Sequence, residues 1–151
     1  EYINSLIQEK FYHPMNKGGK GAQRLFSTNR GKVGLIYPDF ISKNSSSRII
    51  ADAKYKPIKN IGNKDYLQVL AYMFRFNAKK GFYLYPDSVN EDDLRLILNQ
   101  GTTYENNVGS RNDVMIVKCG LTIPSFADSY DDFVAQINNN EIDFLSFLFS
   151  N

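Results

Sequence analysis

The chain has 151 residues, 42% of them hydrophobic, and a formal net charge of +2, which fits one ordinary domain with its own core. No apolar run approaches the roughly 18 residues of a membrane span, and no basic-then-apolar leader opens the chain. We therefore expect a cytoplasmic protein with no membrane partner. With one cysteine, Cys119, and one histidine, His13, the chain excludes an internal disulfide, a cysteine-based zinc site and a pair of catalytic histidines.

The first half of the chain carries one helical pattern and two strand patterns. Apolar residues at helical spacing predict a helix over the first dozen residues, ended by His13-Pro14. Further along, residue types predict a glycine- and lysine-rich loop at 17–21, a strand at 32–39, a turn at 44–47 and a strand at 48–56. We expect the two strands to pair as a hairpin.

The second half predicts a longer helix and several strands. Residues 65–76 are rich in Leu, Ala, Met and Gln, without Gly or Pro, and predict a helix. Strands are predicted at 82–85, 94–98 and 114–121, the first ended by Pro86, and amphipathic segments at 129–137 and 142–149. This order predicts a single α/β (α+β layered) domain over residues 1–151, with a mixed central sheet flanked by helices.

An acidic residue and a lysine lie together in the strand predicted at 48–56. Because strand side chains alternate between faces, Asp52 and Lys54 point the same way, about 7 Å apart along the chain. Asp39 ends the preceding predicted strand and is expected to approach Asp52 across the hairpin. Two carboxylates with main-chain carbonyls suit Mg²⁺, for which Mn²⁺ is a substitute, and Lys54 would position a water beside a phosphate.

The spacing of these residues is weak support by itself, because a chain of this composition produces about one D/E-x-K match by chance. The simplest alternative is a solvated strand face carrying an ion pair. Gln68 and Tyr72, four residues apart, share one face of the following predicted helix, which ordinary helix packing explains equally well. The order and spacing of all three parts distinguish the chemical interpretation from these alternatives.

Taken together, these motifs resemble the PD-(D/E)xK nucleases. The resemblance rests on Pro38-Asp39, on Asp52-Ala53-Lys54 in the next strand, and on Asp65-Tyr-Leu-Gln68-Val-Leu-Ala-Tyr72 in the following helix. Asp-Ala-Lys-Tyr-Lys followed by Asp-x-x-Gln-x-x-x-Tyr is similar to the nuclease subunits of modified-cytosine (5-methylcytosine) restriction systems, the McrC type. The resemblance covers roughly residues 36–86, and nothing specific is identified from Asn90 onward.

The resemblance implies a restriction-endonuclease-like core that cleaves double-stranded DNA with Mg²⁺ and is recruited by a McrB-like AAA+ GTPase. It assigns Asp39, Asp52 and Lys54 to the catalytic positions and Gln68 and Tyr72 to the supporting helix. Many relatives place a further metal-binding glutamate on the first helix, for which Glu1, or less well Glu9, is the candidate. Since the chain opens at Glu1 without Met, we expect the usual N-terminal partner-binding region to be missing.

Two other functions stay open at this point. The same fold would serve a non-catalytic scaffold for the GTPase, or a repair-type exonuclease. The loop at 17–21 does not bind nucleotide as a P-loop does, because Gly21 stands where that motif needs Ser or Thr after Lys20. With Arg24, Arg30 and Lys32 nearby, it would either contact the DNA backbone or remain a solvated basic loop.

Overall fold

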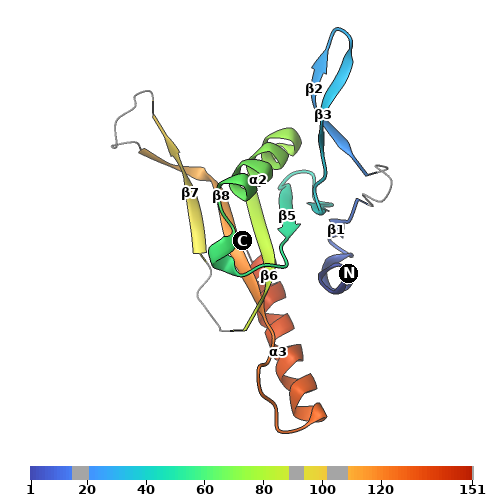
Figure 1. Cartoon of the computed structure of the whole chain (residues 1–151), viewed down its shortest axis with the longest axis vertical. Helices are drawn as coiled ribbons and strands as arrows, with labels where there is room; N and C mark the ends of the chain where they lie inside the picture. Colours follow the sequence, from blue (N-terminus) through green and yellow to red (C-terminus); the bar gives the residue numbers. More distant parts are fainter. Residues whose placement is uncertain (15–20, 89–93, 102–108, 151) are drawn as a thin grey trace.

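A six-stranded mixed sheet forms the centre of the protein (Figure 1). The computed structural model describes residues 1–14, 21–88, 94–101 and 109–150. In spatial order the strands are β1 (Phe11–Tyr12), β4 (Phe40–Ser42), β5 (Ile49–Ala53), β6 (Lys80–Asp87), β8 (Gly109–Thr122) and β7 (Leu94–Gln100). Strands β5, β6 and β8 are parallel to one another, and the other neighbours are antiparallel. The predicted mixed sheet flanked by helices is confirmed.

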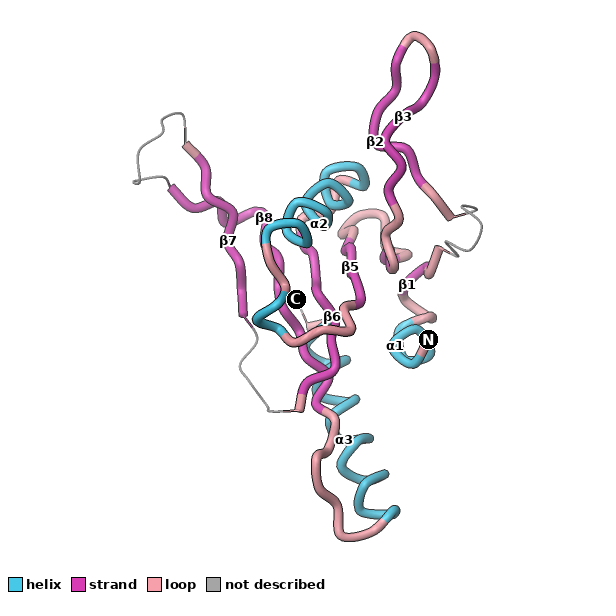
Figure 2. The backbone as a smooth tube through the Cα atoms, in the orientation of Figure 1, coloured by secondary structure: helices cyan, strands magenta, loops and turns pink. Residues whose placement is uncertain are grey.

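Helices cover both faces of this sheet (Figure 2). Helices α1 (Tyr2–Ile7) and α3 (Tyr130–Phe149) pack on one face, where Ala51, Phe82 and Val117 point. Helix α2 (Asn63–Phe76) packs on the other, with a short 3-10 helix, η2 (Ile58–Asn60), leading into it. Because strand residues alternate, β5 sends Ala51 to one core and Ile50 to the other. Cys119 is buried in the core under α3.

A second, two-stranded sheet projects from the body (Figure 1). It consists of β2 (Gln23–Thr28) and β3 (Gly31–Ile36), which pair antiparallel. The predicted pairing of strand 32–39 with strand 48–56 is therefore wrong, because β5 pairs with β4 instead. Gly31, with φ +130°, turns β3 back onto β2. Pro38 then falls between β3 and β4, where it has no N–H to give to a ladder.

Two predicted helical boundaries also change. The first helix ends at Ile7 rather than after a dozen residues, since Phe11 pairs with Ser42 as part of β1. The two segments predicted at 129–137 and 142–149 are one continuous helix, α3, begun by Ser129, whose side chain accepts the N–H of Asp132. Neither Gly nor Pro interrupts that stretch, so the asparagines between the segments stay helical.

The remaining predicted strands are present and longer than expected. Strand β6 continues past Tyr85, and Pro86 keeps its register opposite Leu121 of β8. The segments 94–98 and 114–121 lie within β7 and β8. Among the helices of the described residues, none is long and apolar enough to cross a membrane.

Candidate active site

Asp52 and Lys54 meet on the face of the sheet that α2 covers. Asp52 is the fourth residue of β5 and is only 3% exposed. Its Oδ2 lies 2.6 Å from Nζ of Lys54, as the same-face prediction requires. The alternative of a solvated strand face is wrong, because the acidic member of the pair is buried. Taking a carboxylate out of water is costly, so this arrangement needs either compensation or a function.

Lys54 is held by three acceptors. Besides Asp52, its Nζ lies 3.2 Å from Oδ1 of Asp65 and donates to Oε1 of Gln68 at 3.2 Å. An ammonium has three N–H donors, so each has a partner in this arrangement. Burial by itself would lower the pKa of Lys54, but Asp52 and Asp65 raise it above its ordinary value. Lys54 is therefore a fixed positive charge at neutral pH.

Asp39 reaches this cluster from the loop between β3 and β4. Its Oδ2 accepts the backbone N–H of Ala53 at 2.9 Å, which fixes it to the strand segment between Asp52 and Lys54. Its backbone carbonyl accepts a hydrogen bond from Nδ1 of His13 at 2.7 Å, and the His13 ring stacks on Phe40. The structure brings Asp39 to β5 as expected, although through β4 rather than through the predicted hairpin.

The surroundings of Asp52 make it the unusual carboxylate of the group. Burial raises its pKa above the ordinary value and the nearby Asp39 adds to the rise, while Lys54 opposes it. Its buried Oδ2 is compensated by the ammonium of Lys54, which lies within ion-pair distance. A buried carboxylate needs such a compensating charge, which either Lys54 or a bound cation could supply.

The donor set fits a hard divalent cation. Asp39 and Asp52 supply carboxylate oxygens, and Mg²⁺ is commonly bound by one or two carboxylates while it keeps several waters. Within the described ranges, no three His, Cys, Asp or Glu side chains gather closely enough to form a complete protein cage. A cation held by the two carboxylates would therefore keep water as most of its ligands.

Helix α2 supplies the supporting side chains. Oε1 of Gln68 accepts a hydrogen bond from Lys54, and Nε2 of Gln68 donates one to Oη of Tyr72 at 2.6 Å. The Tyr72 phenol also bonds to the backbone of Tyr37, and burial raises its pKa. Gln68 and Tyr72 thus form a chain of hydrogen bonds that runs from Lys54 to the segment just before Asp39.

Asp65 is a site residue that the sequence interpretation did not assign. It occupies the third position of α2, where its Oδ2 accepts the N–H of Gly62 at 3.0 Å. The same oxygen lies 2.7 Å from Nζ of Lys56. Burial would raise the pKa of Asp65, but Lys56, Gly62 and Lys54 lower it to about 2. The sequence feature that could have identified Asp65 is an acidic residue in the first turn of a predicted helix, which an ordinary helix cap explains equally well.

Glu1 and Glu9 are not brought to this cluster. Glu1 is exposed and caps α1, which packs on the opposite face of the sheet from Asp52. Its neighbour Tyr2 hydrogen bonds to Glu141 of α3. Glu9 is exposed beyond the end of α1. Of the basic loop expected at 17–21, all but Gly21 lies outside the described residues.

A known protein family matches the first part of the chain. The family described as "McrBC 5-methylcytosine restriction system component" matches residues 1–86, more than half of the chain. The chain belongs to this McrBC family. The matched part ends in β6, so it contains every residue of the cluster, from Asp39 to Tyr72. No curated protein matches the chain.

In this McrBC-family chain, two more polar residues continue the row that starts at Asp52. Asp52 is in register with Tyr83 of β6, and Tyr83 with Lys118 of β8. Burial raises the pKa of Tyr83, to which the charge of Asp52 adds. Lys118 is 5% exposed, and its Nζ lies 3.2 Å from the carbonyl oxygen of Ile61. Lys118 therefore holds the segment between η2 and α2, ahead of Asp65.

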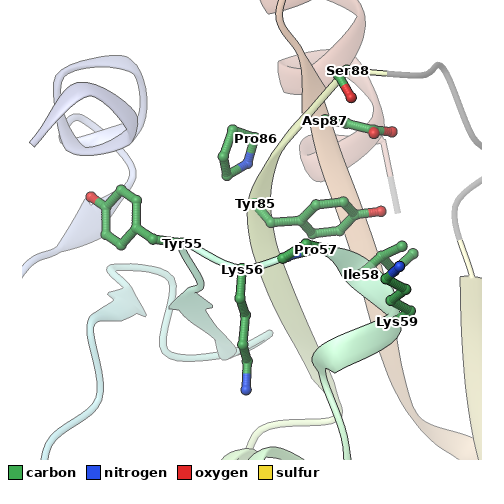
Figure 3. Close-up of a pocket in the computed structure, with 9 residues that line it drawn as sticks. All are labelled: Tyr55, Lys56, Pro57, Ile58, Lys59, Tyr85, Pro86, Asp87 and Ser88. Carbon is green, nitrogen blue, oxygen red and sulfur yellow. The ribbon is translucent and has the colours of Figure 1, made fainter.

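A pocket of about 500 Å³ is lined in part by Lys56, the ion-pair partner of Asp65 (Figure 3). It lies between residues 55–59, which follow β5, and residues 85–88 at the end of β6. Tyr55, Pro57 and Tyr85 give it aromatic and apolar walls, and Lys59 adds a basic group. Lys56 joins the pocket to the site, because its side chain leads to its ion-pair partner Asp65. The pocket thus lies at the carboxyl ends of two parallel strands and shares Lys56 with the ion pairs of the cluster.

Proposed function

We propose that this member of the McrBC family is the metal-dependent nuclease domain of a McrC-like restriction subunit, hydrolysing phosphodiester bonds of DNA. The observation that carries the proposal is the buried carboxylate of Asp52, which lies beside the fixed ammonium of Lys54. Asp39, tied to the same segment of β5, supplies a second carboxylate. This is the arrangement that the resemblance to PD-(D/E)xK nucleases implies.

Each side chain has a separate task in this proposal. Asp39 and Asp52 would hold Mg²⁺, which would supply an activated water and neutralise charge on the phosphate oxygens. During cleavage, Lys54 replaces its contact with Asp52 by a contact with the attacking water or the scissile phosphate. Its contacts with Asp65 and Gln68 are kept and hold it in position. The oxygen of a water molecule attacks phosphorus and releases one proton to solvent, the P–O bond to the leaving strand breaks, and the leaving oxygen takes up one proton from solvent.

The supporting residues act by positioning. Gln68 fixes Lys54, and Tyr72 fixes Gln68, so loss of either would loosen the ammonium without removing a metal ligand. Asp65 forms ion pairs with both Lys54 and Lys56. With Asp39 and Asp52 included, the cluster has three carboxylates and two ammoniums before a cation binds. The pocket beside Lys56 is sized for a nucleotide of the cleaved strand next to the scissile phosphate.

Membership of a restriction-system family supports a proposal for the substrate and the partner. Double-stranded DNA in the cytoplasm is the proposed substrate, and a McrB-like AAA+ GTPase the proposed partner. A non-catalytic scaffold has no use for a carboxylate and a lysine held together at a buried position, because removing both charges from water costs folding free energy. The buried pair therefore favours an enzyme over the scaffold.

The test is cleavage of covalently closed circular DNA, with Mg²⁺ or Mn²⁺, in the presence and absence of the GTPase partner. Nicking or linearisation that needs the metal and is lost in Asp52→Asn supports an endonuclease. Digestion restricted to linear DNA with free ends would favour the repair-type exonuclease. Absence of cleavage together with absence of carboxylate-dependent metal binding would favour the scaffold.

A further inference from the structure

The β2–β3 hairpin, here called the arm (residues 23–36), stands apart from the two layers of the core (Figure 1). Each strand has six residues, so the arm extends about 20 Å at roughly 3.3 Å per residue. Its turn is ordered, since Oγ1 of Thr28 donates to the carbonyl of Gly31 and accepts the N–H of Arg30. The arm is thus a formed β-ribbon.

The base of the arm is attached to the candidate site. Nε of Arg75 on α2 donates to the carbonyl of Arg24 at 2.7 Å. Ile36 is buried in the core under α2, and Leu25 packs against it. The backbone of Tyr37, the next residue, bonds to the phenol of Tyr72. The arm therefore has a defined position relative to Asp39, which follows within three residues of Ile36.

The arm is basic along its whole length. Residues 21–36 contain Arg24, Arg30 and Lys32 and no acidic residue. Among the described residues, no ion pair involves any of these three side chains. Three unpaired cations on a ribbon without acids form a surface complementary to a polyanion.

One side of the ribbon is also apolar and open. The pairing puts Phe26 opposite Val33 and Arg24 opposite Leu35, all on one face. Phe26 is 59% exposed and Val33 and Leu35 are each 48% exposed. An apolar strip alone would suit a protein partner equally well, but the accompanying charge favours nucleic acid.

We propose that the arm lies in a groove of duplex DNA and holds the duplex against the Asp39–Asp52 site. This inference rests on the proposed nuclease function and adds the element that grips the substrate. The major groove, about 12 Å wide, admits a two-stranded ribbon. Arg30 and Lys32 at the turn contact phosphates, while Phe26 and Val33 make apolar contacts with base edges such as thymine methyls.

The test is duplex binding measured without cleavage, in the full chain carrying Asp52→Asn, by fluorescence anisotropy over a range of salt concentrations. The added pair Arg30→Glu and Lys32→Glu reverses two charges at the exposed turn. We expect affinity to fall at least tenfold. The slope of log K against log salt should decrease by about 2, since each lost phosphate contact removes about 0.9. Lys10→Glu with Arg95→Glu, exposed positions away from the arm, makes the same charge change and should affect both quantities much less.

Phe26→Ala provides a second variant that changes no charge. It should weaken duplex binding without altering the salt slope or the melting temperature, because Phe26 is mostly exposed. Unchanged affinity and slope in the charge-reversed arm would overturn the proposal. So would unchanged DNA affinity with lost binding of the GTPase partner, which would make the arm a protein-docking surface. Failure of the nuclease proposal looks different: the wild-type chain would bind duplex through the arm but not cleave it.

Discussion

The backbone N–H of Ala53 donates to a carboxylate oxygen of Asp39 at 2.9 Å. Ala53 is the residue between Asp52 and Lys54, so one main-chain hydrogen bond connects the two halves of the candidate site. The position of Asp39 relative to β5 is thus set by backbone as well as by side-chain packing. The same bond explains how Asp39 can join the cluster although β3 does not pair with β5.

Asp39 should influence the protonation of Asp52. Burial raises the pKa of Asp52 and the charge of Asp39 adds to the rise, so Asp39→Asn should bring this pKa down toward its ordinary value. Carbon-13 NMR titration of aspartate carboxyl groups, without metal, measures the change. Asp143→Asn, on the exposed side of α3, is the matched control and should leave the titration of Asp52 where it is. An unmoved Asp52 titration in Asp39→Asn would mean that the two carboxylates are not coupled.

Lys54 should matter for cleavage more than for metal binding. Lys54→Ala removes a preorganised charge beside the proposed phosphate, and we expect cleavage to slow by about 10²–10³-fold. Metal binding should still occur at neutral pH. The pH at which binding begins should be higher than in wild type, because Asp52 loses the ammonium that opposes the rise of its pKa. Single-turnover cleavage and calorimetric metal titration at several pH values test both parts. Cleavage at the wild-type rate would show that Lys54 does not act at the phosphate.

Asp65 should stabilise the fold at neutral pH and lose this effect in acid. Its pKa is about 2 in the folded chain against an ordinary value of 3.8. The ionised form is therefore favoured by folding. Its contribution is present above about pH 4 and disappears as pH falls toward 2. The difference in the free energy of unfolding in urea between wild type and Asp65→Asn should become smaller as the pH falls through that range. The difference between wild type and Asp143→Asn should not change in this way. A difference that is constant with pH would exclude the proposed ion pairs.

Much of the local structure could be predicted from the sequence because it depends on neighbours along the chain. The composition of residues 65–76 was enough for α2, and alternation in β5 was enough to put Asp52 and Lys54 on one face. The i, i+4 spacing of Gln68 and Tyr72 was likewise enough to put them on one face of the helix, where the structure has a hydrogen bond between them. In each case the deciding interactions join residues within one element or one turn.

The remainder depends on contacts between distant segments. Residues 31–36 pair with 23–28 rather than with β5, and no periodicity distinguishes these two partners. Asp65 looks like a helix cap until Lys54 and Lys56 are placed around it. His13 donates to the carbonyl of Asp39 across 26 residues of sequence, a contact that only the folded chain reveals.

Gln68 and Tyr72 should act as a unit. Gln68→Ala and Tyr72→Phe each break the hydrogen bond between the two side chains, which is worth about 1 kcal/mol or about fivefold in rate. We expect the double variant to cost less than the sum of the two single effects. Both single effects should be smaller than that of Asp52→Ala. A double-mutant cycle on single-turnover cleavage measures the coupling, and strict additivity would show that Tyr72 does not act through Gln68.

The most direct test of the account is single-turnover cleavage of duplex DNA with Mg²⁺ by wild type, Asp52→Asn and the control Asp143→Asn, with the GTPase partner present. The account predicts cleavage by wild type and by Asp143→Asn, and its loss in Asp52→Asn although duplex is still bound. Each variant changes one carboxylate to an amide, so a general charge effect would appear in both. Cleavage by Asp52→Asn at the rate of the other two proteins would contradict the assignment of this site.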